Sequence, residues 1–239
     1  MRYEDNSCGC PKKNISGHYL ENQSKSKSIL EWMSSHKKTV ITALMLCFFA
    51  VLWVYFAIQN KQEKYKIMAN DFYNLKYSYY SGNISDALLR ATTLAHGNSD
   101  SGYVVMAKFV QAGILHKDLD PKCLPILKEI SDNKKISRFF RDYAYAMYAN
   151  ASLDIMTSEE IESKIHEIIN TLQELINTGS PWEDYLSMSL SYCLLRIKDY
   201  DKAIHTLTNL KTKSLDIATK SKIYSLLNYA RLQQNKNKK

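Results

Sequence analysis

The sequence predicts an all-α protein with a single N-terminal transmembrane helix followed by a stack of antiparallel helical hairpins. Three observations support this fold class. The segment Thr39 to Gln59 spans 21 residues without a charge. Glycine and proline are scarce, at 7 and 4 of 239 residues. Beyond residue 60, apolar residues recur at helical spacing, and no run shows the period of two that is typical of a strand.

The apolar segment 39–59 is long enough to cross a membrane. At 1.5 Å per residue it forms a helix roughly 31 Å long, about the thickness of a bilayer's hydrocarbon core. It contains no Gly and no Pro. Because it is longer than the apolar part of a usual signal peptide and has no cleavage site of small residues at its end, we interpret it as a signal anchor that is retained.

The charges beside this segment do not decide its orientation. Four lysines precede it closely and four follow it, namely Lys25, Lys27, Lys37 and Lys38, then Lys61, Lys64, Lys66 and Lys76. A short basic tail resists translocation, whereas a long domain crosses largely regardless of its charge. We therefore expect residues 1–38 in the cytoplasm and the C-terminal domain, residues 60–234, on the other side.

The N-terminal tail, residues 1–38, is expected to be largely disordered, because residues 1–27 are polar and lack an apolar period. Residues 28–36 have two interpretations. Ile29, Leu30, Trp32 and Met33 suit a short interfacial helix that leads into the membrane. Continued disorder is the alternative.

The net charge of +8 is concentrated at the two ends of the chain. Residues 211–239 hold eight Lys/Arg and one acid, and residues 1–38 hold seven Lys/Arg and four acids. A nucleic-acid surface needs a clustered basic face on the folded domain. We therefore expect no nucleic-acid partner, and we interpret residues 235–239 as a basic disordered tail.

Start and stop signals divide the domain into helices. The first continues out of the membrane over residues 61–81 and ends at Gly82 and Asn83. Others are expected at 84–96, at 99–117, after Pro121, at 135–155, after Thr157, after Ser180, at 200–211 and at 215–234.

Two of these helix starts carry specific capping signals. Thr157 and Glu160 have the spacing of a capping box. Ser180 suits an N-cap with Pro181 at the first helical position, and Glu183 follows in the first turn.

Helices joined by short turns suggest stacked pairs, and stacked pairs of this kind often repeat with a fixed period in the sequence. KDYDKAIHTLTNL, residues 198–210, resembles the second helix of a tetratricopeptide (TPR) repeat, with Ala203 as the small residue that lets two helices approach closely. Residues 82–94 repeat this scheme around Ala87. Leu124 and Ile165 are candidates for the same place in two intervening helices, with spacings of 37, 41 and 38 residues. Helical hairpins without true repeats are the alternative.

The whole layout resembles the ancillary subunit of the bacterial SecYEG translocon (YfgM-like), whose domain is shared with a cell-division coordinator. The resemblance covers about residues 30–234, and its most telling stretch is residues 181–210. It implies a single-pass protein of the bacterial inner membrane with a periplasmic TPR-like domain. The residues expected to form TPR packing are Ala87, Ala91, Leu94, Trp182, Leu190, Ala203, Leu207 and Leu210.

The function that follows is a membrane-anchored interaction scaffold. By resemblance, its partners are translocon subunits and periplasmic chaperones, and it links SecYEG to those chaperones in protein export. A scaffold for cell-envelope assembly or cell division is the alternative. The sequence leaves the oligomeric state open, so a homo-oligomer stays among the alternatives.

No motif predicts an enzyme. The sequence has no H-E-x-x-H, P-loop, G-x-G-x-x-G or G-x-S-x-G. We therefore expect no catalytic residues, no cofactor and no metal. Glu162 and His166 suit a local surface pair or, alternatively, half of a metal site. Cys123 and Cys193 are either two buried thiols or one disulfide.

Two clusters of tyrosines have two interpretations each. Tyr77, Tyr79 and Tyr80 form the first cluster, and Tyr143, Tyr145 and Tyr148 form the second. Each cluster suits either the lining of a peptide-binding groove or ordinary packing at helical spacing.

The membrane segment has one narrow face of small residues, made of Ala43, Cys47, Ala50, Val54 and Ala57. In lipid, small side chains let a second helix pack closely. This face predicts lateral docking on the translocon or on a second copy of the chain. A plain anchor is the alternative.

Overall fold

The computed structural model describes residues 36–97, 101–210 and 216–237, without the side chains of Val40, Ala43 and Asn237. Within these ranges the chain forms nine helices and no strand, which confirms the all-α class. By its internal contacts the chain divides into two units, Met1–Lys64 and Tyr65–Lys239. The helices are α2 (Lys37–Tyr80), α3 (Ile84–Ala95), α4 (Gly102–Lys117), α5 (Cys123–Asp132), α6 (Arg138–Ile155), α7 (Ser158–Asn177), α8 (Glu183–Arg196), α9 (Tyr200–Asn209) and α10 (Ile217–Asn237).

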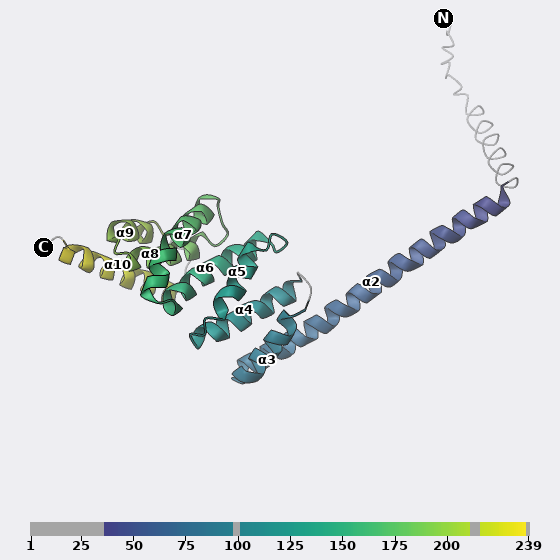
Figure 1. The fold of residues 1–239 in the computed structure, drawn as a ribbon, viewed down its shortest axis with the longest axis horizontal. Coiled ribbons are helices and arrows are strands. Elements are labelled where there is room, and N and C mark those ends of the chain that lie inside the picture. The colour runs from purple at the N-terminus through teal and green to yellow at the C-terminus, as the bar shows by residue number, and fades with distance from the viewer. Residues whose placement is uncertain (1–35, 98–100, 211–215, 238–239) are drawn as a thin grey trace, which may run out of the picture. The chain divides into compact units, whose positions relative to one another are not determined.

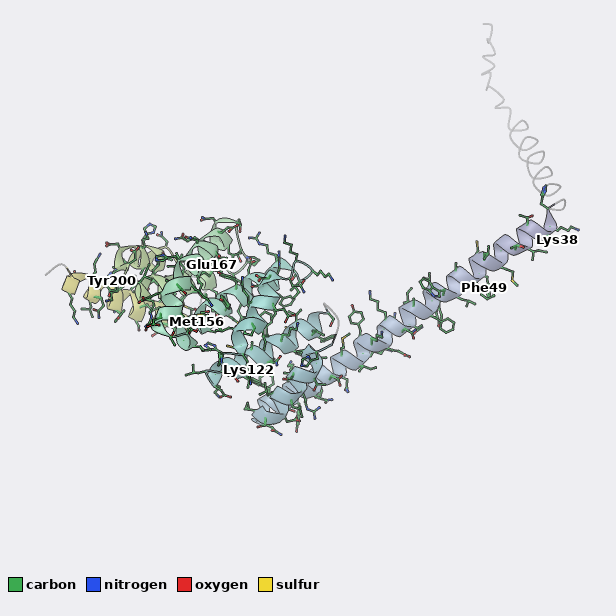
Figure 2. The ribbon with its side chains drawn as sticks, viewed as in Figure 1. Lys38, Phe49, Lys122, Met156, Glu167 and Tyr200 are labelled. Carbon is green, nitrogen blue, oxygen red and sulfur yellow. The ribbon has the colours of Figure 1, made fainter. Side chains whose placement is uncertain are left out.

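In the first unit, the described residues lie almost entirely on α2. The most apolar 18-residue window of α2 has a mean hydropathy of 2.5, and none of that window is buried. Phe49, for example, is 59% exposed and stands out from the helix (Figure 2). In the described part of the chain, α2 is the one helix long and apolar enough to cross a membrane. The prediction that the helix continues beyond residue 59 is confirmed, because α2 ends at Tyr80.

In the second unit, helices that follow one another in the sequence also pack on one another. Figure 1 shows α3 to α10 in chain order along the domain. The closest neighbours are α3 with α4, α5 with α6, α7 with α8, and α8 with α9. Contacts also skip one helix, from α4 to α6 and from α6 to α8. The alternate helices α4, α6 and α8 therefore lie beside one another.

Four turns between helices share one geometry. The residue after the helix C-cap has a positive φ in each: Gly82 at 81°, Leu119 at 55°, Gly179 at 72° and Lys198 at 62°. After α2 and α8 the next residue also caps the following helix, and its backbone angles are nearly the same in Asn83 (φ −81°, ψ 73°) and Asp199 (φ −80°, ψ 72°). The turns after α2 and α8 therefore repeat one local structure, although they lie far apart in the sequence.

Hydrogen bonds explain why the helices stop at these turns. After α8, the N–H of Asp199 donates to the carbonyl of Leu194 at 2.9 Å, and the N–H of Lys198 donates to that of Leu195 at 3.1 Å. This is the Schellman pattern, which satisfies carbonyls that the helix end leaves without partners. The turns after α2, α4 and α7 show the same pair of bonds.

The cap residues also define a common register for the second helix of each pair. Ala87 and Ala203 lie four residues after the caps Asn83 and Asp199, and both are fully buried. The same count from Thr157, the cap of α7, leads to Ile161, which is 1% exposed. In α7, Ile161 therefore occupies the position equivalent to Ala87 and Ala203. The spacing in the sequence predicted Ile165, which lies one turn later. Helix α5 departs from this register, because its N-cap is Lys122, and Leu124 is half-buried while Cys123 and Leu127 are fully buried.

The largest apolar cluster lies between α6, α7, α8 and α9. Ile165, Leu172 and Leu186 are among its fully buried side chains, and Ala203 of α9 closes it. Burying each large aliphatic side chain contributes about 1.5–3 kcal/mol. This cluster therefore holds the middle of the domain together and sets the positions of α6 and α8.

Several expected boundaries differ in the structure. Helix α4 begins at Gly102 rather than at residue 99, α6 begins at Arg138 rather than at residue 135, and α9 ends at Asn209 rather than at residue 211. Helix α8 begins at Glu183 rather than at Pro181, because Ser180 still belongs to the end of α7 and donates its N–H to the carbonyl of Leu175 at 3.3 Å. Helix α10 continues to Asn237, past the expected end at Gln234 and into the expected tail 235–239. Residues 1–35, with the candidate interfacial helix up to residue 35, lie outside the described residues.

Candidate functional site

A groove runs along α8. A cavity of about 730 Å³ lies between α6, α8 and α10, with His116 of α4 at its edge. A second cavity of about 470 Å³ shares Tyr185 and Met188 with the first. We call the two together the α8 groove. The larger cavity is lined by His116, Met147, Asn150, Leu153, Asp154, Tyr185, Met188, Tyr192, Leu195, Arg196, Lys198, Tyr200, Lys222 and Tyr229.

Helix α8 supplies this lining because it has two apolar faces. Leu186, Leu190 and Leu194 recur every four residues and are buried in the core. Tyr185, Met188 and Tyr192, spaced by three and four residues on another face, line the groove. The second face is half-buried, because Met188 packs partly on α9 and α10, and Tyr185 packs partly on the cluster between α6 and α9.

Aromatic rings connect the first helices of neighbouring pairs at one end of this groove. Tyr143 of α6 lies 5.3 Å from Phe109 of α4 and 5.5 Å from Tyr185 of α8, measured between ring centroids. Trp182 lies 4.6 Å from Tyr143, and its Nε1–H donates to the carbonyl of Phe139 at 2.8 Å. Such ring pairs stabilise by about 0.5–1.5 kcal/mol beyond their buried area. The row fixes the spacing of α4, α6 and α8.

Three polar side chains of the lining are half-buried. The amide nitrogen of Asn150 donates to the Tyr185 hydroxyl at 3.3 Å. The Asn150 Oδ1 and the Tyr192 hydroxyl are both buried and have no hydrogen-bond partner among the described residues. Burial, followed by the nearby Tyr143, raises the pKa of Tyr185. The Tyr185 hydroxyl therefore stays protonated at neutral pH, as a neutral hydrogen-bonding group.

Cations gather at the C-terminal end of α8. Arg196 and Lys198 are exposed there, and the Lys222 ammonium lies 5.4 Å from the centre of the Tyr192 ring. The carboxylate of Asp154 lies 2.9 Å from Nε2 of His116. This end of the groove therefore combines an aromatic ring, three cations and one carboxylate that already has a partner.

The residues expected to form TPR packing are spread over three apolar clusters. Ala87, Ala91 and Leu94 of α3 are buried against Leu75 of α2. Leu190 and Ala203 lie in the cluster between α6 and α9. Leu207 and Leu210 pack against α10. Trp182 alone lies beside the α8 groove, where it also lines the smaller cavity.

The tyrosines of the two clusters lie in different surroundings in the structure. Tyr145 is buried in the core, and burial raises its pKa to about 12. Tyr148 packs partly against that core, and Tyr143 lies in the aromatic row. Tyr77 and Tyr80 are 69% and 79% exposed on α2, so they line neither a groove nor a core.

Sequence reasoning missed Asn150, Tyr192 and Lys222. The three residues lie on three different helices, α6, α8 and α10, and none belongs to a recognisable motif. One signal was present for α8, because Tyr185, Met188 and Tyr192 recur at helical spacing opposite a complete leucine stripe. A second apolar stripe on a helix that already has a core-facing one indicates a further packing surface or a groove.

The two candidate cysteine thiols are free, so the disulfide alternative is not formed. Burial raises the pKa of Cys123 and raises that of Cys193 to about 12. Glu162 and His166 are both exposed on α7, without a hydrogen bond or ion pair between them. Within the described ranges, no three His, Cys, Asp or Glu side chains lie close enough together to hold a metal ion.

On the membrane segment, Cys47, Ala50, Val54 and Ala57 are exposed, and the side chain of Ala43 lies outside the described part. No other described element packs on this face, so lateral docking stays a prediction. Comparisons of the chain with protein-family models, with curated proteins and with solved structures give no match.

Proposed function

We propose that this chain is a membrane-anchored scaffold that binds segments of other proteins in the α8 groove. One observation carries the proposal: the alternate helices α4, α6, α8 and α10 all contribute side chains to the lining of one groove. Stacked helical pairs with such a continuous surface bind extended protein segments without catalysing a reaction. Tethering to a membrane raises the concentration of the scaffold beside membrane machinery.

The repeat interpretation extends this proposal to a TPR-like domain. Two observations support it: the equal backbone angles at Asn83 and Asp199, and the buried alanines four residues after each. Contacts between α4 and α6, and between α6 and α8, add support, because stacked repeats place their first helices side by side. In this scheme α10 corresponds to the first helix of a repeat and packs at the end of the stack.

The proposed location is the bacterial inner membrane, with α2 as a single-pass anchor, the N-terminus in the cytoplasm and residues 60–234 in the periplasm. The hydropathy and full exposure of the window in α2 support the anchor. The resemblance of residues 181–210 supports the role of an ancillary translocon subunit that links SecYEG to periplasmic chaperones. The structure adds a groove on α8, the helix in which that resemblance begins.

Topology and partners are tested together in cells. A reporter that is active only in the cytoplasm, fused after Lys239, should be inactive, and a periplasmic reporter at the same position should be active. Affinity purification of the full chain should then recover translocon subunits and periplasmic chaperones. Activity of the cytoplasmic reporter, or recovery of neither class of partner, would contradict the proposal. Concentration of the chain at the septum would support the cell-division alternative.

The small-residue face of α2 is tested in the same purification. Replacing Ala43, Ala50 and Ala57 with leucine should reduce the recovery of translocon subunits, because bulkier side chains keep a second helix away. The matched control replaces Ile41 and Met45 with leucine on the opposite face of the helix, which should leave recovery unchanged. Equal recovery from both variants would identify α2 as a plain anchor.

A further inference from the structure

Three tyrosines form an exposed stripe on the last turns of α2. Tyr73, Tyr77 and Tyr80 are 68%, 69% and 79% exposed. Because they are four and three residues apart, they lie on one face of the helix. The buried residues Leu75 and Ser78 lie on the opposite face, towards α3. We call Tyr73, Tyr77 and Tyr80 the tyrosine stripe.

No other element of the domain covers this stripe within the described ranges. Tyr73 and Tyr77 have no ring contact or hydrogen bond there. The Tyr80 ring contacts Tyr79 and Lys76, which belong to the same helix. Tyrosine is enriched in interfaces between proteins, because its large ring is apolar and carries one polar group. Three such rings on one exposed helix face therefore indicate a contact surface.

The charges beside the stripe suit a parallel pair of identical helices. Lys76 lies at one edge of the stripe, with its ammonium 6.0 Å from the centre of the Tyr80 ring. Asn74 lies at the other edge. In a parallel pair with two-fold symmetry, opposite edges meet, so each Lys76 faces Asn74 of the other copy. Lys66 lies on the stripe face two turns before Tyr73, so the repulsion of like charges ends the contact there.

The membrane anchor proposed above brings identical stripes together. Helix α2 contains both the candidate membrane span and the stripe. Two copies in one membrane run in the same direction, and the same number of residues separates the span from the stripe in each. A parallel approach of two copies therefore places each stripe beside its counterpart, as in an isologous contact.

The size of the stripe fits a pair held in a membrane better than a pair in solution. A fully covered tyrosine side chain buries about 150–250 Å². Because each ring is more than two-thirds exposed, two stripes together bury on the order of 1,000 Å² at most. This area is the lower limit for a specific interface. Anchoring in a shared membrane raises the effective concentration of the second copy and compensates for the small area.

We infer that the tyrosine stripe of α2 pairs with the same stripe of a second copy of this chain, with the two helices parallel. Tyr77 is central in the stripe, so it contacts Tyr77 of the second copy near the two-fold axis. Tyr73 and Tyr80 extend the contact on either side. This inference rests on the membrane anchor of the proposed function and is independent of the translocon and chaperone partners. It adds a second scaffold domain to each complex.

Co-purification of two differently tagged full-length copies, expressed together and extracted from membranes in a mild detergent, tests the inference. Capture of one tag should recover the other copy of the wild type. Tyr77→Glu in both copies, or Tyr77→Lys in both, should lower this recovery at least about fivefold, because like charges then face each other. Tyr77→Glu in one copy with Tyr77→Lys in the other should give several-fold higher recovery than either matched pair, because opposite charges then meet.

Tyr79→Glu in both copies is the matched control, because Tyr79 is an exposed tyrosine of the same helix outside the stripe. It should leave recovery of the second copy unchanged. Restored recovery in the mixed pair also shows that both Tyr77 variants are folded. Absence of a second copy in the wild type, undiminished recovery from the Glu pair, or no gain in the mixed pair would overturn the inference.

The outcome for the proposed function is separate. Recovery of translocon subunits and periplasmic chaperones without a second copy leaves the scaffold function and removes the pairing. Loss of those partners from the Tyr77 variants, with unchanged recovery of the second copy, assigns the stripe to another protein and contradicts the pairing. Failure of the membrane anchor is measured independently by the topology reporters.

Discussion

Leu119 and Lys198 hold a backbone conformation that normally favours glycine. Their φ angles are 55° and 62°, and each follows the C-cap of the first helix in a pair. Gly82 and Gly179 take the same place after α2 and α7. A side chain in this left-handed region costs about 1–2 kcal/mol, because its Cβ approaches the following carbonyl. The two turns persist because the packed helices on either side impose them.

Replacing Lys198 with glycine should therefore stabilise the domain. We expect the free energy of unfolding to rise by about 1 kcal/mol, since glycine adopts this conformation without strain. Urea unfolding of the full chain in detergent, followed by circular dichroism, measures the change. Lys198→Ala is the matched control, because it removes the charge and keeps the Cβ. A gain of the same size in the alanine variant would show that charge rather than backbone strain is responsible.

Helix α7 illustrates how one element carries its own start signal. The predicted capping box is confirmed: the Thr157 hydroxyl accepts from the N–H of Glu160 at 3.3 Å, and the Glu160 carboxylate accepts from the N–H of Thr157 at 3.0 Å. The bond from the Thr157 backbone, and then the bond from its hydroxyl, lower the pKa of the Glu160 carboxyl. The cap is therefore strongest when Glu160 is ionised.

This cap should weaken in acid. A carboxyl with a lowered pKa in the folded state stabilises the protein above the ordinary glutamate pKa of about 4.3. That contribution is lost as the pH falls through the lowered value. Glu160→Gln retains an oxygen that accepts from Thr157 and loses the titration. We therefore expect the wild type, and not the variant, to lose this part of its stability in acid.

Urea midpoints measured at neutral pH and at a pH well below the ordinary glutamate pKa of about 4.3 check this expectation. The two proteins should differ at neutral pH and converge in acid. Asp86 and Asp216 also have lowered pKa values, and they titrate equally in both proteins, so the comparison isolates Glu160. A constant difference between wild type and variant at the two pH values would contradict the prediction.

On the scale of the whole domain, stability should vary along the stack of helices. In a linear array each helix gains its stability mainly from its nearest neighbours. Helices α6 and α8 contact helices on both sides and also each other, whereas α10 packs mainly on α9. The end of the stack therefore opens at a lower free energy than the middle.

Native-state hydrogen exchange should show this gradient. We expect the amides of α10 to exchange faster than those of α7, although the two helices have nearly equal lengths of 21 and 20 residues. The comparison uses the full chain in detergent, with protection read helix by helix from mass spectrometry of its peptides. Equal protection of α7 and α10 would indicate that the domain opens as one cooperative unit.

Local signals allowed much of this architecture to be predicted. A 21-residue stretch without charge identified the candidate membrane helix, and Thr157 with Glu160 located the start of α7. Ala87 and Ala203 were predicted at close helix contacts and are fully buried. Such features depend on residues within a turn or two of each other. The sequence therefore determined the fold class, most helix boundaries and the face that each helix buries.

The groove was decided only by the tertiary structure. Asn150, Tyr192 and Lys222 come from three different helices, and their positions relative to one another follow from the packing of α6, α8 and α10. The start of α8 was decided in the same way, because the end of α7 occupies the N–H of Ser180. Sequence patterns predict which face of a helix is apolar. Which side chains meet across a groove depends on how far each helix is shifted and rotated against its neighbours, and long-range packing sets both.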